Sequence, residues 1–224
     1  MNYVAPFDAP SLSGQQGFDR IQGVDLTNDP PAAANLAMYA THVYNQHDLL
    51  ACTAYSVAAL MSMRTNIVSK RWLPFDADEC FSAVAQSRDR GVSTRVMQYA
   101  CSPGMLILGE QGRMRIPGFA FAQLGAGQAE NVRQVKAALA AMVPVALALL
   151  LPVDWDRLPG RSMSTVPGGA YHQVCLTGYD ADRVYFVNSL GTAWGDNGFG
   201  SMSWGVVTNA AQWDCCYALA ALAG

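Results

Sequence analysis

Six cysteines and three histidines are the residues of this 224-residue chain with the clearest capacity for nucleophilic chemistry. Cys52 directly precedes a run of residues with helical spacing. At the start of a helix, the helix dipole and unpaired backbone N–H groups favour a thiolate. Taken alone, Cys52 is more typical of a buried structural cysteine. A catalytic role for Cys52 therefore depends on a base elsewhere in the chain and on a side chain that orients this base.

His172 has the setting that such a base requires. It follows two glycines, opens an apolar segment and precedes Asn188, which ends the next apolar segment. If the two segments pair as a β-hairpin, the carboxamide of Asn188 comes beside the imidazole and can orient it. His42 and His47 lie shortly before Cys52 and are typical of loop residues. The sequence thus predicts a nucleophile, a base and an orienting group.

Periodicity indicates the elements that position these groups. Helical spacing predicts a helix from Cys52 onward with one buried face, formed by Val57, Leu60, Met61, Arg64, Ile67 and Val68. Further helices are expected at 78–86, at 93–101 with Ser93 as the N-cap, and at 129–142. Strands are expected at 145–151, 171–179, 183–188, 199–204 and 213–219. Helices followed by strands predict an α+β protein whose two halves form separate packing layers.

Three segments resemble the motifs of the papain-like cysteine peptidases. The segment NQHDLLACTAYS is similar to the motif around the catalytic cysteine of that family, with Gln46 six residues before Cys52. GGAYHQVCLTGYD resembles the histidine strand of the family. NSLGTAWGDNGFG, which begins at Asn188, resembles its asparagine motif, although Leu190 stands where the family has Trp. The three segments also follow the order of the family.

This resemblance implies a fold and a set of roles. The fold would have a helical left lobe and a β-rich, barrel-like right lobe, with the active-site cleft between them. Cys52 would be the nucleophile, His172 the general base and acid, Asn188 its orienting partner and Gln46 the oxyanion-hole donor. The thiol and imidazole would form a thiolate–imidazolium pair. Substrate would contact Gly91, Val92, Ser93, Ala170, Tyr171 and Trp194, although plain core packing is an equally good interpretation of Trp194.

The chain divides into two parts on this interpretation. Residues 1–44, rich in Pro, Gly and polar side chains, are expected to form an extended N-terminal leader. Residues 45–224 would form the peptidase domain, with the helical lobe at about 45–127 and the β-rich lobe at about 128–224. The leader is too short for the long helical propeptide of secreted family members. We therefore expect activity to be restrained by narrow specificity, by a regulatory or inhibitory protein partner, or by prompt delivery elsewhere.

Composition excludes several other classes of function. The net charge of -3 without a block of like charges argues against a nucleic-acid partner or an anionic membrane surface. The apolar run 137–153 approaches a membrane-spanning length, but Pro144 divides it into a helix end and a strand, so no membrane span is expected. The cysteines lack CxxC spacing, so no metal site is expected, and no cofactor is predicted. Reduced thiols are expected because the chain has 224 residues and no secretion signal.

The predicted function is that of a cysteine protease that hydrolyses peptide or isopeptide bonds through a thioester. A deamidase or acyltransferase with the same triad differs only in the fate of that thioester, and a non-catalytic binding module, for example a translocated effector, is a further alternative. The N-terminus has no basic start and no apolar segment of the kind that makes a signal peptide. A bacterial protein is expected, either cytoplasmic or exported without a classical signal peptide.

Overall fold

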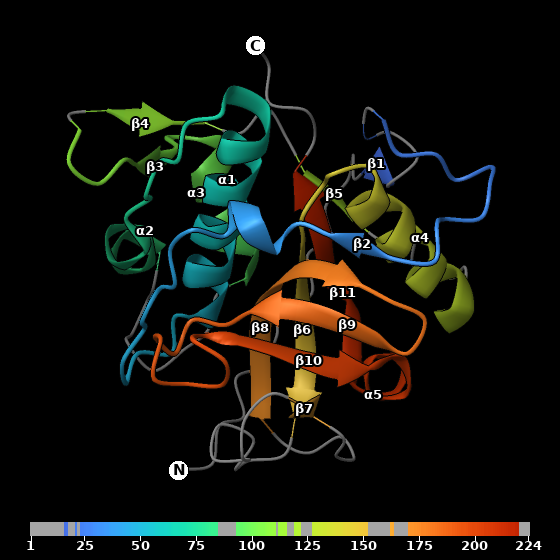
Figure 1. Cartoon of the computed structure of the whole chain (residues 1–224). Helices are drawn as coiled ribbons and strands as arrows, with labels where there is room; N and C mark the ends of the chain where they lie inside the picture. Colours follow the sequence, from blue (N-terminus) through green and yellow to red (C-terminus); the bar gives the residue numbers. More distant parts are fainter. Residues whose placement is uncertain are drawn as a thin grey trace.

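The computed structural model describes residues 16–17, 21, 23–84, 93–110, 112–115, 119–121, 127–151, 162–163 and 170–219. Within this part of the chain, three helices lie on one side of a mainly antiparallel sheet and two helices cover the sheet elsewhere (Figure 1). The first group is α1 (Cys52–Ser69), α2 (Ala77–Val84) and α3 (Ser93–Cys101), and the second is α4 (Gln128–Ala140) and α5 (Trp204–Ala210). The α+β class predicted from the sequence is confirmed.

The sheet has the strand order β1-β5-β11-β6-β8-β9-β10-β7, with β2 paired to β8. Its long strands are β6 (Val145–Leu151), β8 (Ala170–Tyr179), β9 (Arg183–Val187), β10 (Phe199–Ser203) and β11 (Ala211–Leu219). Its short strands are β1 (Gln16–Gly17), β2 (Ala34–Asn35), β5 (Phe119–Phe121) and β7 (Ser162–Met163). A separate hairpin joins β3 (Met105–Leu106) to β4 (Arg113–Met114). All five long strands fall where the sequence predicts strands.

Helix α1 is the central helix of the molecule. It packs against α2 and α3 on one side and against β8, β6 and β11 on the other. For this reason the whole stretch from Thr53 to Thr65 is buried, including Ser56 and Ser62, rather than a single face. Val68, expected on the buried face, is 52% exposed because the last turn extends beyond these neighbours. The sequence pattern therefore predicted the helix correctly, but it underestimated how much of the helix surface is buried.

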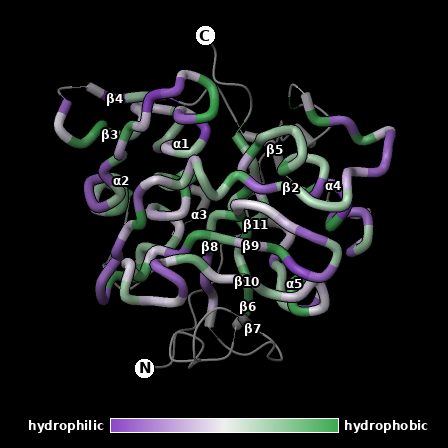
Figure 2. The backbone as a smooth tube through the Cα atoms, in the orientation of Figure 1, coloured by the Kyte–Doolittle hydropathy of each residue, from purple (hydrophilic) through white to green (hydrophobic). Residues whose placement is uncertain are grey.

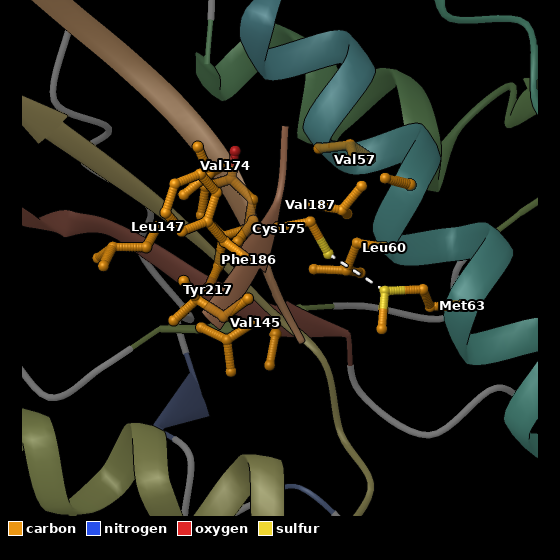
Figure 3. Close-up of a cluster of buried hydrophobic side chains, with 14 of the residues drawn as sticks. Val57, Leu60, Met63, Val145, Leu147, Val174, Cys175, Phe186, Val187 and Tyr217 are labelled. Carbon is orange, nitrogen blue, oxygen red and sulfur yellow. Dashed lines mark hydrogen bonds between the residues drawn. The ribbon is translucent and has the colours of Figure 1, made fainter. Parts of the chain in front are cut away.

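The core joins α1 to the sheet. Val57, Leu60 and Met63 of α1 lie against strand residues that include Val174 and Val187 (Figure 3). The central strands are hydrophobic along most of their length, whereas hydrophilic residues are concentrated in the outer loops (Figure 2). Burial of this apolar surface is the main force that holds the helices and the sheet together. It also fixes the start of α1 relative to β8.

The segment before α1 is part of the packed structure where it is described. Ala34 and Asn35 extend the sheet as β2, and a short 3-10 helix follows at Ala37–Tyr39. Leu36, between them, is fully buried. Tyr44 is also buried, and its hydroxyl accepts a hydrogen bond from the backbone N–H of Phe75 over 2.9 Å. Residues 34–44 thus contact both the sheet and the helical part.

Two local features differ from the expectation. Helix α5 occupies 204–210, a range for which the sequence pattern predicted no helix, and the strand before it ends at Ser203. The side chain of Ser203 accepts a hydrogen bond from the N–H of Val206 and so caps α5. Ser93, expected as an N-cap, is instead the first residue of α3.

The apolar run 137–153 divides near Pro144 as the sequence predicts. The run contributes the end of α4 and then, from Val145, strand β6. Among the described residues, no helix combines the length and the apolar character that a bilayer span needs. Five cysteines have described side chains, and all five are free thiols: Cys52, Cys80, Cys101, Cys175 and Cys216.

Candidate active site

Cys52 is the first residue of α1, as expected from the sequence. The residue before it, Ala51, has no side chain that could cap the helix, so the first-turn N–H groups have no side-chain cap there. The Cys52 side chain is half-buried. Its sulfur accepts a hydrogen bond from the backbone N–H of Gln173, the residue after His172 in β8. The start of α1 and the histidine strand are thus in direct contact.

His172 and Asn188 are paired. The His172 Nε2 atom lies 2.8 Å from Asn188 Oδ1, and both side chains are buried, at 4% and 3% exposure. Asn188 directly follows β9, which is antiparallel to β8, so the hairpin predicted from the sequence brings the two residues together. Asn188 Oδ1 also accepts the backbone N–H of Ser189 over 2.8 Å. Because this oxygen only accepts, Nε2 carries the proton and Nδ1 is the nitrogen that can act as a base.

Gln46 is buried, and its side chain is held at both ends. Its Nε2 donates to the carbonyl of Leu49 over 2.7 Å, and its Oε1 accepts from Ser189 Oγ over 2.5 Å. Its backbone N–H donates to the carbonyl of Ser189 over 2.8 Å. The amide nitrogen has two hydrogens, so one remains for an oxyanion after the bond to Leu49. Sequence reasoning did not single out Ser189, although the residue directly follows Asn188.

The loop after Asn188 docks on the segment that carries Gln46. The N–H of Gly191 donates to the carbonyl of Tyr44 over 2.9 Å. At the other end of the loop, the carbonyl of Gly198 accepts the N–H of Asn188 over 2.9 Å. Gly198 has a φ of +90° and lies against Val43, whose Cγ1 would be only 2.3 Å from a Cβ at this position. Only glycine allows the loop to come this close to Val43. The contact between the loop and this segment keeps Asn188 and Gln46 in one unit.

We expect Gly198→Ala to lower the free energy of unfolding by about 2–4 kcal/mol, because it combines a left-handed backbone with a steric clash. Urea denaturation measures this change. Gly109→Ala is the matched control, since Gly109 has a φ of +80° and no atom within 4 Å of an added Cβ. The control should lose only about 1–2 kcal/mol from backbone strain. Equal losses in the two variants would contradict the docking role of Gly198.

Burial shifts the pKa values of both groups toward the neutral forms. Desolvation raises the pKa of the Cys52 thiol, although the hydrogen bond from Gln173 opposes this shift. Desolvation lowers the pKa of His172 to about 4, and the hydrogen bond to Asn188 opposes this shift in turn. Each effect disfavours a charged group. These surroundings favour a neutral thiol and imidazole over the ion pair expected from the resemblance.

A neutral His172 makes stability depend on pH. The unfolded chain takes up a proton at this histidine near pH 6.5, whereas the folded protein does so near pH 4. Stability therefore falls as the pH drops through this range, by about 3 kcal/mol for this group. The loss from pH 7 to pH 4.5, measured by urea denaturation, should be smaller in His172→Gln, which does not titrate. The same loss in both proteins would mean that His172 does not titrate as a neutral buried group.

The structure describes the side chains of only some of the predicted substrate-binding residues. Tyr171 is half-buried in β8 beside His172. Trp194 packs on Phe186, with ring centroids 5.9 Å apart, which agrees with the core-packing interpretation of this residue. Ser93 begins α3 and Ala170 begins β8, but their side chains are not described, and Gly91 and Val92 lie outside the described residues. The structure therefore brings together Cys52, His172, Asn188 and Gln46, and leaves the substrate contacts as predictions.

This fold is the fold of the papain-like cysteine proteases. Three solved structures, all similar to this chain, illustrate the match. Xylellain, a cysteine protease from Xylella fastidiosa, has a TM-score of 0.74 at 13% identity, over 100% of this chain and 92% of that one. Digestive procathepsin L 3 of Tenebrio molitor larval midgut has a TM-score of 0.68 at 16% identity, over 92% of this chain and 76% of that one. The Carica candamarcensis cysteine protease CMS1MS2, in complex with E-64, has a TM-score of 0.68 at 17% identity, over 85% of this chain and 99% of that one.

Sequence comparison adds nothing to this structural likeness. No protein-family model matches the chain, and no curated protein matches it in sequence. At 13–17% identity, the solved structures show the fold that the resemblance implied, and they leave the roles of individual residues open. Those roles rest on the geometry of Cys52, His172, Asn188 and Gln46.

Proposed function

We propose that this protein is a cysteine peptidase that hydrolyses peptide or isopeptide bonds through a Cys52–His172–Asn188 triad. The observation that carries the proposal is the buried 2.8 Å contact between His172 and Asn188, beside the cysteine that opens α1. The contact of the Cys52 sulfur with the N–H of Gln173 supports it, because it places the thiol at the histidine strand. The shared fold with cysteine proteases is a second, independent support.

The first half of the reaction forms a thioester. Nδ1 of neutral His172 takes the proton of the Cys52 thiol as the sulfur attacks the substrate carbonyl. The remaining side-chain N–H of Gln46 and the backbone N–H of Cys52 stabilise the oxyanion. The C–N bond then breaks, and His172 gives the proton to the leaving amine. Asn188 holds the ring in place and stabilises its protonated form.

The second half of the reaction consumes water. His172 takes a proton from a water molecule, whose oxygen attacks the thioester carbonyl. The C–S bond breaks, the acid product leaves, and the proton returns to the Cys52 sulfur. These steps need no cofactor, since the side chains supply the nucleophile and the proton transfers. The proposed partner is accordingly a protein or peptide substrate.

A peptide library tests this proposal against the alternatives. We expect incubation with the protein, followed by mass spectrometry, to reveal new peptide termini that are absent with Cys52→Ala. Conversion of Gln side chains without cleavage would indicate a deamidase, and peptides joined to added amines would indicate an acyltransferase. No change in any peptide would favour a binding module and would overturn the proposal. Cellular location and a regulatory partner remain predictions from the sequence.

A further inference from the structure

A second group of polar side chains lies behind the proposed triad. Ser56, Gln173 and Asn188 all line one narrow void between α1, β8 and the end of β9, which has no room for a water molecule. They are almost completely buried, at 3%, 1% and 3% exposure. Four of their polar atoms have no hydrogen-bond partner among the described residues: Ser56 Oγ, Gln173 Oε1, Gln173 Nε2 and Asn188 Nδ2.

Such a group calls for a physical explanation. The large majority of buried side-chain polar atoms in proteins are hydrogen-bonded, because a buried group without a partner destabilises the fold. The two tyrosines at the void do not supply partners. The hydroxyl of Tyr44 is bonded to Ser62 and to the N–H of Phe75, and that of Tyr55 donates to Asp78. The unpaired atoms include both donors and acceptors, so their natural partners are one another.

Gln173 connects this group to the reacting residues. It follows His172 in β8, so its side chain points to the opposite face of the strand. Cys175, two residues further along the same face, contacts Met63 of α1, with 3.7 Å between their sulfur atoms (Figure 3). The Gln173 side chain is therefore directed toward α1, where it meets Ser56 at the void. Its backbone N–H, in contrast, donates to the Cys52 sulfur.

We propose that Gln173 is a positioning residue of the proposed active site, whose carboxamide oxygen accepts a hydrogen bond from Asn188 Nδ2. Both side chains border the same void, which is too small to hold a water that could bond to them instead. The amide nitrogen of Gln173 then donates to Ser56 Oγ. Asn188 is thereby held with Oδ1 toward His172 and Nδ2 toward Gln173. This inference rests on the proposed function and adds to it a support for the orienting residue.

The first test compares two variants of β8. Gln173→Met keeps the length of the side chain and removes its polar atoms. Thr177→Val is the matched control, since Thr177 is also a buried β8 residue with an unpartnered hydroxyl, but it does not line the void. We expect Gln173→Met to lower kcat by about tenfold at an unchanged KM, as loss of an orienting hydrogen bond implies. Thr177→Val should keep the wild-type kcat.

A second readout does not depend on turnover. The hydrogen bond that His172 donates to Asn188 raises the pKa of His172 against the effect of burial. If Gln173→Met loosens Asn188, the His172 pKa measured by NMR titration should fall by about half a unit or more. In Thr177→Val it should stay unchanged. Gln173→Met removes the partner of Asn188 and of Ser56, so it should also unfold at a lower temperature than the wild type, whereas Thr177→Val loses an unpartnered hydroxyl and should not.

The outcomes separate this inference from the proposed function. Wild-type protein without any Cys52-dependent turnover would refute the proposed function, and the NMR titration would still decide the role of Gln173. A Gln173→Met variant with the kcat and the His172 pKa of Thr177→Val would overturn the positioning role alone. A lowered unfolding temperature with both of these values unchanged would show that Gln173 is only structural.

Discussion

Replacement of Cys52 or His172 with alanine should reduce kcat for peptide hydrolysis by about 10⁵- to 10⁶-fold, and the double variant should be no slower than either single one. The reason is that the thiol and imidazole act as a unit. Without the base, the Cys52 thiol stays protonated at neutral pH, because burial raises its pKa. Without the thiol, His172 has no nucleophile to activate. Continuous assays with a cleaved library peptide would measure all three variants.

Matched replacements control for damage to the fold. Cys101 is half-buried like Cys52 but lies at the end of α3, and His47 is an exposed histidine near the site in sequence. Cys101→Ala and His47→Ala should retain at least about half of the wild-type kcat, as substitutions outside the catalytic unit do. Turnover that survives in Cys52→Ala would show that another group is the nucleophile. Multiplicative losses in the double variant would show that the two residues act independently.

Replacement of Gln46 with alanine should lower kcat by about 100- to 1000-fold while KM changes little. Its side-chain N–H is proposed to bind the oxyanion, which is fully developed only in the transition state. Gln46→Glu tests the donor itself, because a carboxylate has the same shape and no N–H to donate. We expect the two variants to be similarly slow. A Gln46→Glu variant with the wild-type rate would refute the oxyanion role.

Replacement of Ser189 tests the same role of Gln46 with a smaller expected loss of kcat. The Ser189 hydroxyl donates to Gln46 Oε1, but the bond from Gln46 Nε2 to the Leu49 carbonyl remains when the hydroxyl is removed. Ser189→Ala should therefore lower kcat by less than about tenfold, the effect of one neutral hydrogen bond. A loss as large as that of Gln46→Ala would mean that Ser189 alone holds the amide in place. Urea denaturation of each variant separates these effects from lost stability.

Much of the fold was predictable because it is encoded locally. The ranges of four helices and five strands follow from apolar periodicity, which depends on neighbours along the chain. The pairing of His172 with Asn188 is also local, since a hairpin of adjacent strands brings them together. Short strands such as β1 and β2 were not predicted, because two residues are too few to show an alternating hydrophobic pattern. Helix α5 was missed because its signal is the cap at Ser203 rather than an apolar stripe.

The sequence by itself determined which residues can do chemistry: a cysteine at a helix start, a histidine and an asparagine on neighbouring strands, and a glutamine before the cysteine. Only the tertiary structure decided how they are held. Gln46 is fixed by Ser189, 143 residues away, and Cys52 by the backbone of Gln173. The burial that shifts the pKa of His172 comes from packing, as does the void behind Asn188. Residue type and spacing specify reactive groups and local geometry, whereas contacts between distant segments depend on how whole elements pack.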